Sequence, residues 1–405
     1  MGYVGDTLGR KKALEISIFL MAFPTFAMGC LPSYAAVGWI STLLLIIVRL
    51  LQGLSVGGQL MSSLVFTLER HPHARWGWYG SFVLGAANFG TLIGGIMAAI
   101  LKNSLSESQL ASWGWRIPFL SGIIVGLSGM YLKFYVKEDP LSHLNAKHSD
   151  DYEVNKPVNP LKEAFGHENR RSLLSAIMVP MLWAGGFYMT FVWMAVFMDK
   201  MVDPPVPKSF VVNSLSLFIS VCLFFPVAGW LSDVWGRRCV MNMGGIGLML
   251  FTPLAVLIVN KGNAVGALAA QCFIGICLSF WGAPMMAWLV ESFPPESRLT
   301  AVAIGYNLAQ AIAGGITPVL ATFVVYNVGP NRVGLMITAL AVIGLTGLNC
   351  VSQNRRYDTE NYLELDIESD VQSVIQDTPE DENRASWEAR NTDAENIVIF
   401  AREIS

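Results

Sequence analysis

The chain has 405 residues, of which 53% are hydrophobic and only 14% are charged, with a formal net charge of −3. Soluble proteins carry about 25% charged residues, so this composition excludes an ordinary soluble domain. Stretches of about 20 residues contain few charges, and a helix of that length crosses the hydrocarbon core of a bilayer. The sequence lacks the ten-residue pieces of alternating polarity that a transmembrane barrel requires. It therefore predicts an all-α polytopic membrane protein.

Ten apolar stretches follow one another along the chain, and each is predicted to span the membrane as a helix. Their approximate bounds are 13–31, 37–68, 78–101, 114–135, 172–197, 209–231, 239–260, 264–290, 300–327 and 333–353. Several contain prolines, which a membrane helix tolerates because neighbouring helices satisfy the freed backbone groups. A charged stretch separates four spans from six. The predicted domains are an N-terminal bundle (1–135), a cytoplasmic interdomain loop (136–171), a C-terminal bundle (172–353) and an acidic tail (354–405).

Lysine and arginine gather before the first span and in the loops after each even-numbered span. Positively charged loops face the cytoplasm, so both termini are predicted to be cytoplasmic in a multi-pass protein of the plasma membrane, with the lipid bilayer as its surroundings. The tail holds 14 acidic and 5 basic residues, a net charge of −9. Such a composition is typical of a disordered segment, although three apolar residues could form one short amphipathic face. We expect a monomer that does not bind nucleic acid.

Chemistry that needs a metal, a cofactor or a nucleophile has little support in this sequence. The six cysteines lie in or at the ends of apolar stretches and form no C-x-x-C pair. The five histidines lie in polar loops without the spacing of metal ligands. No glycine-rich loop stands between a strand and a helix, as nucleotide binding would require. We expect no metal, no cofactor and no enzymatic activity.

An internal repeat relates the two predicted bundles. The opening MGYVGDTLGRK fits the pattern G-x-x-x-D-x-x-G-R-K, and GWLSDVWGRR at 229–238 repeats that pattern 227 residues later. Two further pairs have nearly the same offset. These pairs are Glu69…Arg75 with Glu291…Arg298, and Asn88…Gly94-Gly95 with Asn307…Gly314-Gly315. Three features at nearly one offset indicate two copies in the same orientation.

Parallel halves joined by a long loop are typical of one superfamily of transporters. On its G-x-x-x-D-x-x-G-R-[KR] motif, the sequence resembles the major facilitator superfamily over essentially all of 1–353. It looks more narrowly like the metabolite:proton symporter family, which includes proline/betaine, shikimate and α-ketoglutarate transporters. The stretches that carry this narrower resemblance are RLLQG at 49–53 with Gly57-Gly58, WGWRIPF at 113–119, Glu138-Asp139-Pro140 and Glu291-x-Phe293-Pro294. The resemblance implies two parallel, pseudo-symmetric helix bundles.

The two copies of the motif differ in what comes before them. Two predicted spans, 172–197 and 209–231, precede the second copy, and none precedes the first. The expectation is that ten of twelve transmembrane helices are present, the equivalents of helices 3–12. A chain without the first two helices would lack part of its cavity wall, which keeps open the alternative of a non-transporting remnant or sensor.

Arg49 is the strongest candidate for binding substrate. It lies deep in an apolar span, where a charge costs about 2.5–3.5 kcal/mol, and its planar guanidinium matches a carboxylate. A structural ion pair, or snorkelling toward an interface, is the alternative. Gln52, Gln59, Asn88 and Asn307 are the other candidates, each of which could instead bond neighbouring helices. The resembled family commonly has glutamate at the position of Gln59, and glutamine cannot carry a proton.

A second group of charged residues is predicted to control the conformation. Asp and Arg at the helix junctions can pair with each other, with a helix N-terminus or with the acidic and basic residues that end other spans. Such contacts at the cytoplasmic face would hold one access state closed. A positive-inside charge cluster without a switching role is the alternative. The residues of this group are Asp6, Arg10, Asp233, Arg237, Glu69, Arg75, Glu291 and Arg298.

The resemblance and these residues together predict a secondary active transporter. It would move a small polar metabolite, such as a proline- or betaine-like osmolyte or a small carboxylate, by alternating access. Proton-coupled symport is expected from the resemblance, with the proton as coupling ion. A membrane enzyme would need a nucleophile and base at membrane depth, and the sequence offers no such pair.

Overall fold

A computed structural model describes residues 3–4, 7, 10–135, 164–166, 169–295 and 297–351. Those residues belong to one compact unit, residues 1–357, and the second unit, 358–405, contains none of them. The predicted tail (354–405), most of the interdomain loop and the predicted role of Asp6 therefore lie outside the described residues. Within them every long element is a helix, and nine helices are long and apolar enough to span a membrane. The all-α membrane fold predicted from composition is confirmed.

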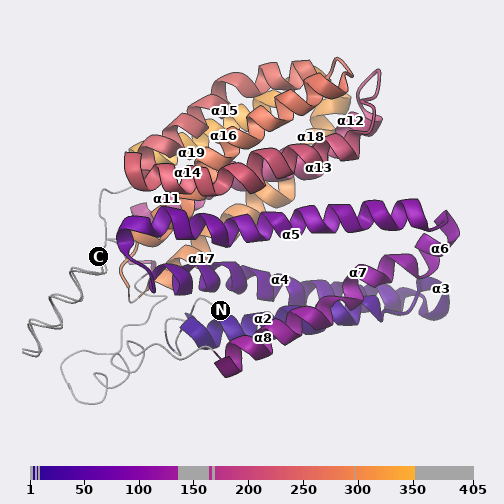
Figure 1. The fold of residues 1–405 in the computed structure, drawn as a ribbon, viewed down its shortest axis with the longest axis horizontal. Coiled ribbons are helices and arrows are strands. Elements are labelled where there is room, and N and C mark those ends of the chain that lie inside the picture. Colours follow the sequence, from indigo (N-terminus) through magenta and orange to yellow (C-terminus); the bar gives the residue numbers. More distant parts are fainter. Residues whose placement is uncertain are drawn as a thin grey trace, which may run out of the picture. The chain divides into compact units, whose positions relative to one another are not determined.

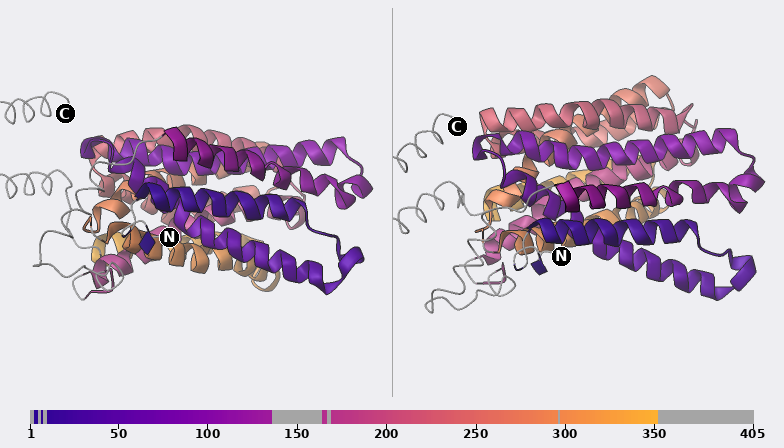
Figure 2. Two further views of the ribbon diagram at one scale, coloured as in Figure 1. Left: turned by 90° about the horizontal axis from the view of Figure 1, so that it is seen from below. Right: turned by 60° about the horizontal axis from the view of Figure 1, so that its bottom comes forward.

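The helices of the first half (residues 10–135) run roughly along one direction (Figures 1 and 2). Helix α2 packs against α4, α7 and α8, and α4 packs against α5. The elements are α2 (Arg10–Gly29), α3 (Tyr34–Val37), α4 (Trp39–Leu68), η1 (His73–Arg75), α5 (Trp76–Ser104), α6 (Glu107–Ser112), η2 (Gly114–Arg116), α7 (Ile117–Leu120) and α8 (Gly122–Tyr135).

The predicted span 114–135 is not one long helix. It divides at Ser121, whose hydroxyl donates to the Pro118 carbonyl at 2.6 Å, into the short α7 and the 14-residue α8. The break lies where the chain meets α2, because a Cβ added to Gly122 would lie 2.9 Å from the Phe26 nitrogen. Close packing on α2 therefore accounts for the difference from the prediction, which rested on hydropathy alone.

The second half (residues 169–351) contains six long helical stretches, several with an internal π-helical segment. Their elements are α11 (Arg170–Phe187), η3 (Tyr188–Trp193), α12 (Met194–Lys200), α13 (Ser209–Leu217), η4 (Phe218–Leu223), α14 (Phe224–Trp235), α15 (Arg237–Val259), α16 (Ala264–Glu291), α17 (Arg298–Ala309), η5 (Gln310–Gly314), α18 (Gly315–Asn327), η6 (Pro330–Arg332), α19 (Gly334–Thr346) and η7 (Gly347–Val351). Helices α15 and α16 pack on each other and α19 packs on α15, with α11 against α16, α17 and α19.

Helices α4 and α5 of the first half make the main contacts with the second half. Helix α5 lies along α14 and α16, and α4 meets α17 (Figure 1). Glycines permit the first contact, because a Cβ added to Gly77 would lie 2.6 Å from the Gly229 carbonyl oxygen. Small residues at such crossings let two backbones approach closely in a membrane. The close approach of α5 and α14 therefore depends on a glycine in each helix, Gly77 and Gly229.

Helix α4 is less covered than the long helices of the second half. Only 17% of its most apolar window is buried, against 78% for the stretch Arg170–Lys200. Its repeat counterpart, α16, also packs against α11, α13 and α14. The described part of the first half has no helices in the corresponding places, so α4 keeps an open apolar face that includes Leu50 and Leu54.

We call the end of the helices where α4, α14 and α16 finish and α5, α15 and α17 begin the basic end. The large hydrophobic core extends from the second half to this end of α4 and α5, through residues such as Leu64, Leu68 and Trp76. The halves therefore share their core near the basic end, where the described members of the predicted conformational group also lie.

Candidate functional site

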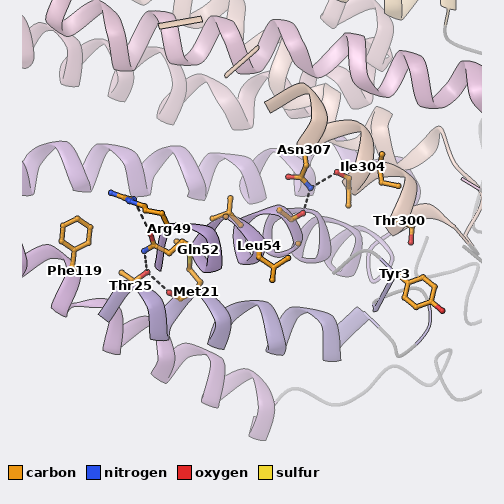
Figure 3. A pocket seen from close by; sticks show the side chains of 15 residues that line it. Tyr3, Met21, Thr25, Arg49, Gln52, Leu54, Phe119, Thr300, Ile304 and Asn307 are labelled. Atoms are coloured by element: carbon orange, nitrogen blue, oxygen red, sulfur yellow. Dashed lines mark hydrogen bonds between the residues drawn. The ribbon is translucent and has the colours of Figure 1, made fainter. Parts of the chain in front are cut away.

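A pocket of about 950 Å³ lies between α4, α2 and α17. Its volume is in the range of small-molecule sites. Most of its wall comes from the first half, and α17 closes it from the second half (Figure 3). The lining residues are Tyr3, Met21, Thr25, Arg49, Gln52, Gly53, Leu54, Val56, Gly57, Gly58, Phe119, Thr300, Ala303, Ile304 and Asn307.

Arg49 stands on the exposed side of α4 and is the one cationic side chain among the described residues that line the pocket. One of its guanidinium nitrogens donates to Gln52 Oε1 at 3.4 Å. No carboxylate of the described residues lies within ion-pair distance of it. Since a guanidinium carries five N–H donors, most of them remain for a ligand.

Gln52 and Thr25 fix the surroundings of Arg49. The Gln52 amide donates through Nε2 to Thr25 Oγ1 at 3.0 Å, and the Thr25 hydroxyl donates to the Met21 carbonyl at 2.7 Å. This chain of bonds settles which way the Gln52 amide points, with its oxygen toward Arg49 (Figure 3). The three residues form an ordered polar wall in an otherwise apolar pocket.

Asn307 occupies the opposite wall and joins the two halves. Its Nδ2 donates to the Gly57 carbonyl of α4 and, at 2.7 Å, to the Ala303 carbonyl of its own helix. A ligand between Arg49 and Asn307 would therefore touch both halves of the molecule. This is the geometry that alternating access needs.

The other two predicted substrate residues lie elsewhere. Gln59 is half-buried on α4 and does not line the pocket. Asn88 is 4% exposed on α5, and its Nδ2 has no hydrogen-bond partner among the described residues. The structure thus brings Arg49, Gln52 and Asn307 together and leaves Gln59 and Asn88 outside. It adds Thr25 and Phe119, which the sequence did not single out.

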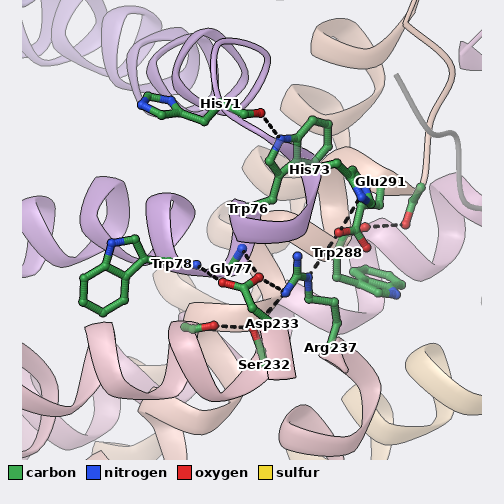
Figure 4. Close-up of polar contacts among 12 residues, drawn as sticks. His71, His73, Trp76, Gly77, Trp78, Ser232, Asp233, Arg237, Trp288 and Glu291 are labelled. Atoms are coloured by element: carbon green, nitrogen blue, oxygen red, sulfur yellow. Dashed lines mark hydrogen bonds and ion pairs between the residues drawn. The ribbon is translucent and has the colours of Figure 1, made fainter. Parts of the chain in front are cut away.

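At the basic end, Asp233 of α14 caps a helix of the other half. Its two carboxylate oxygens accept from the backbone nitrogens of Gly77 at 2.9 Å and Trp78 at 2.8 Å, in the first turn of α5 (Figure 4). The first amides of a helix have no partner within it, and a negative charge there is favourable. The second copy of the motif therefore binds a helix N-terminus across the junction of the halves.

Arg237, at the start of α15, ties this cap to α16. It pairs with Asp233 and donates through Nε to Glu291 Oε1 at 3.1 Å. Arg237 and Glu291 are 7% and 4% exposed, so the aqueous solvent screens this pairing little. The three residues form a buried cluster, Asp233–Arg237–Glu291.

An ion pair that crosses between the halves lies beside this cluster. Arg298 of α17 donates to Glu69 Oε1, just past the end of α4, at 3.2 Å. The Arg298 side chain is fully buried, and its Nε also donates to the Phe293 carbonyl at 3.2 Å. Of the other predicted residues, Arg75 is exposed, and the side chain of Arg10 lies outside the described residues.

The sequence matches the family model of the Major Facilitator Superfamily over residues 1–318 and again over 209–357. The proline/betaine transporter of Salmonella typhimurium is 30% identical over 359 residues, covering 86% of this chain and 70% of that protein. The proline/betaine transporter of Escherichia coli K12 is 29% identical over 354 residues, with 86% and 69% covered.

Solved structures of similar fold belong to the same superfamily. The proton:xylose symporter XylE, bound to 6-bromo-6-deoxy-D-glucose, has a TM-score of 0.68 at 19% identity over 90% of this chain and 85% of that one. The Escherichia coli fucose:proton symporter FucP has a TM-score of 0.62 at 14% identity over 87% and 86%. Such identities show a shared fold alone. The family match, the relatives and the fold agree that this chain belongs to the Major Facilitator Superfamily, whose members are membrane transporters and not enzymes.

Proposed function

We propose that this transporter carries a small zwitterion or carboxylate, with proline- and betaine-like osmolytes as the first candidates. The observation that carries the proposal is the Arg49 guanidinium, which lines the pocket without a carboxylate partner among the described residues and is held beside Gln52. A guanidinium matches a carboxylate in charge and geometry. The names of the relatives point to the same class of cargo.

The proposed mechanism is alternating access across the plasma membrane, with both termini cytoplasmic and the basic end facing the cytoplasm. The contacts of Asp233, Arg237 and Glu291, together with Arg298–Glu69, support a cytoplasmic side that is closed in this conformation. Opening it would break the cap on α5 and the Arg298–Glu69 ion pair, which are the contacts of this group that cross between the halves. The closed and open arrangements would therefore differ in these bonds.

Proton-coupled symport is the energy source that we propose. The described residues that line the pocket include no carboxylate. The side chain of Gln59 cannot take up or release a proton. The proton carrier would therefore stand apart from the substrate wall. A non-transporting sensor of the same family is the second candidate, and Gln59 favours it because its amide cannot carry a proton.

Uptake into proteoliposomes tests the proposal. The substrates are radiolabelled proline, glycine betaine and α-ketoglutarate, each with and without a proton gradient. We expect saturable uptake that Arg49→Ala abolishes and Arg49→Lys weakens, since lysine keeps the charge but loses the fork. Arg332→Ala, which removes an exposed arginine of η6, is the matched control and should leave uptake unchanged.

Competition separates recognition of the carboxylate from recognition of the rest of the ligand. Betaine should compete where choline, which lacks the carboxylate, does not, and proline should compete where prolinamide does not. Uptake that survives Arg49→Ala would refute the assignment of Arg49. Binding of betaine without any uptake would favour the sensor.

A further inference from the structure

One residue of the pocket wall, Phe119, has no part in the function proposed above. It lies on α7, the four-residue helix that ends where the chain breaks at Ser121. Its side chain is half-buried and lines the pocket. In Figure 3 its ring stands at the end of the pocket toward which the guanidinium group of Arg49 extends. An aromatic ring and a cationic side chain therefore lie at the same end of the pocket.

The ring of Phe119 is held in place on the side away from the pocket. It packs against the apolar cluster of Met28, Leu31 and Val48. Its centroid lies 6.0 Å from that of Trp115, at an interplanar angle of 69°, and edge-to-face pairs of this kind are favourable. Since an aromatic side chain also has few rotatable bonds, this ring loses little further freedom when a ligand packs on it.

The charges of the lining side chains determine what kind of ligand fits beside Arg49. The carboxylate of a ligand would use the guanidinium group, as proposed above. The described residues that line the pocket include no carboxylate, so a cationic group of the ligand has no ion-pair partner among them. The face of an aromatic ring is negative and attracts a cation within about 6 Å of its centroid. An aromatic ring is therefore the group that remains for an ammonium.

Two aromatic side chains are among the described residues that line the pocket, Phe119 and Tyr3. Figure 3 shows Tyr3 at the other end of the pocket from Arg49, beyond Leu54 and Asn307. In betaine and in proline, the nitrogen and the carboxylate are attached to one carbon atom. A ligand this short that is held by Arg49 would therefore place its ammonium near Phe119 and away from Tyr3.

A dicarboxylate meets the opposite situation in this pocket. Its first carboxylate would use Arg49, and the described lining residues offer no second cation. Its second carboxylate would then lie against the negative face of Phe119 or against apolar side chains such as Leu54 and Val56. Burying a charge without a partner costs free energy. The lining therefore favours a zwitterion over a dicarboxylate.

We propose that Phe119 determines the substrate class of this site, by receiving the ammonium end of a zwitterion whose carboxylate binds Arg49. The proposal rests on the function proposed above and narrows it to zwitterions, with dicarboxylates excluded. The ring face recognises the charge of the ligand, whereas the apolar walls around it recognise only shape.

Two ligands of one shape separate charge from shape. Glycine betaine and tert-butylacetate have the same outline and the same carboxylate, but only betaine has a positive charge. Their affinities are measured on the purified full chain in detergent at neutral pH, by competition against radiolabelled betaine, which requires no transport. The wild type should bind betaine about three- to thirtyfold more tightly than tert-butylacetate, the range of cation–π energies. α-Ketoglutarate should compete most weakly.

Phe119→Leu should remove the preference for betaine, because leucine remains apolar but has no aromatic face, and the affinity for tert-butylacetate should change little. Phe119→Trp should keep the preference, since tryptophan binds cations best of the aromatic side chains. Phe23→Leu is the matched control, the same substitution on α2 at a side chain that is 72% exposed, and it should keep the wild-type ratio. Monodispersity on size exclusion shows whether each variant is folded.

Arg49→Ala distinguishes a failure of this proposal from a failure of the proposed function, because it should weaken the binding of both ligands. If it does so while folded Phe119→Leu keeps the wild-type ratio, the role of Phe119 is wrong and that of Arg49 stands. If Arg49→Ala changes neither affinity and Phe119→Leu still removes the preference, the role of Arg49 is wrong and that of Phe119 stands. A wild type that prefers tert-butylacetate or α-ketoglutarate, or that binds no betaine, overturns the proposal.

Discussion

The polar wall of the pocket depends on single atoms. Arg49 keeps its place through Gln52 Oε1, and Gln52 keeps its orientation because Thr25 Oγ1 accepts from Nε2. An amide without that acceptor could turn its nitrogen toward the guanidinium, where two donors would repel each other. The hydroxyl of Thr25 therefore acts on the ligand site through two other residues.

Thr25→Val tests this relay, because valine keeps the shape of threonine and removes the hydroxyl. We expect the half-saturation concentration for betaine uptake to rise about two- to tenfold, the value of one modest hydrogen bond. Thr25→Ser, which retains the hydroxyl, should behave as the wild type. Equal uptake by the valine and serine variants would show that Gln52 needs no such support.

At the scale of elements, the junction of α5 and α14 is determined by glycine. Gly77 and Gly229 face each other so closely that a methyl group on either would meet the other backbone. The Asp233 cap forms in the same place, so a change of helix spacing there also affects the ion pairs. Packing and electrostatics at the basic end therefore change together.

Gly77→Ala should push α5 from α14 and cost the closed arrangement about 1–3 kcal/mol through overpacking. Spin labels on Lys12→Cys in α2 and on native Cys239 in α15, with the other five cysteines replaced by serine, measure the separation of the two halves at the basic end. Double electron–electron resonance should show a larger fraction of molecules with a wide separation, and the melting temperature should fall. Gly85→Ala is the control on the same helix, since a Cβ there has no described atom within 4 Å. If both variants behave alike, the close approach does not limit the closed state.

Sequence reasoning performed best on features that depend on neighbours in the chain. Hydropathy predicted ten spans, and nine of them correspond to long apolar helices among the described residues. It could not foresee the break at Ser121 in the tenth, 114–135, which lies where the chain packs against α2. Arg49 was recognisable because a charge deep in an apolar stretch is rare.

Thr25 and Phe119 were missed, because such residues in an apolar span carry no distinguishing signal. The partners of Asp233 and Arg237 were left open among several, since pairing across halves depends on the tertiary structure.

At the scale of the whole molecule, the described ion pairs and helix caps between the halves lie at the basic end. Arg298–Glu69 and the Asp233 cap lie there, and the Asn307–Gly57 bond lies at the pocket. Two of these contacts join α17 to α4 and its C-terminal end, and the third joins α14 to α5, so losing one weakens the closed arrangement without abolishing it. Helix α4, with its open face, takes part in two of them.

Exchanging the charges of the Arg298–Glu69 pair tests whether this pair holds the two halves together. Glu69→Arg places a cation against the fully buried Arg298 and should open the basic end and reduce uptake strongly, since an uncompensated buried charge costs about 3–5 kcal/mol. The double variant Glu69→Arg/Arg298→Glu should recover part of both signals. Arg75→Glu, an exposed change in the neighbouring turn, is the control. Absence of any recovery would indicate that the two residues act independently.

The cap that Asp233 places on α5 also determines which backbone groups water can reach. The amide hydrogens of Gly77 and Trp78 are held by a side chain that belongs to the other half. When the halves separate, α5 loses these acceptors while the rest of the helix remains bonded within itself. Hydrogen exchange at these two amides therefore follows the opening of the molecule. The exchange rates of these two amides therefore report, without any added label, how often the basic end opens.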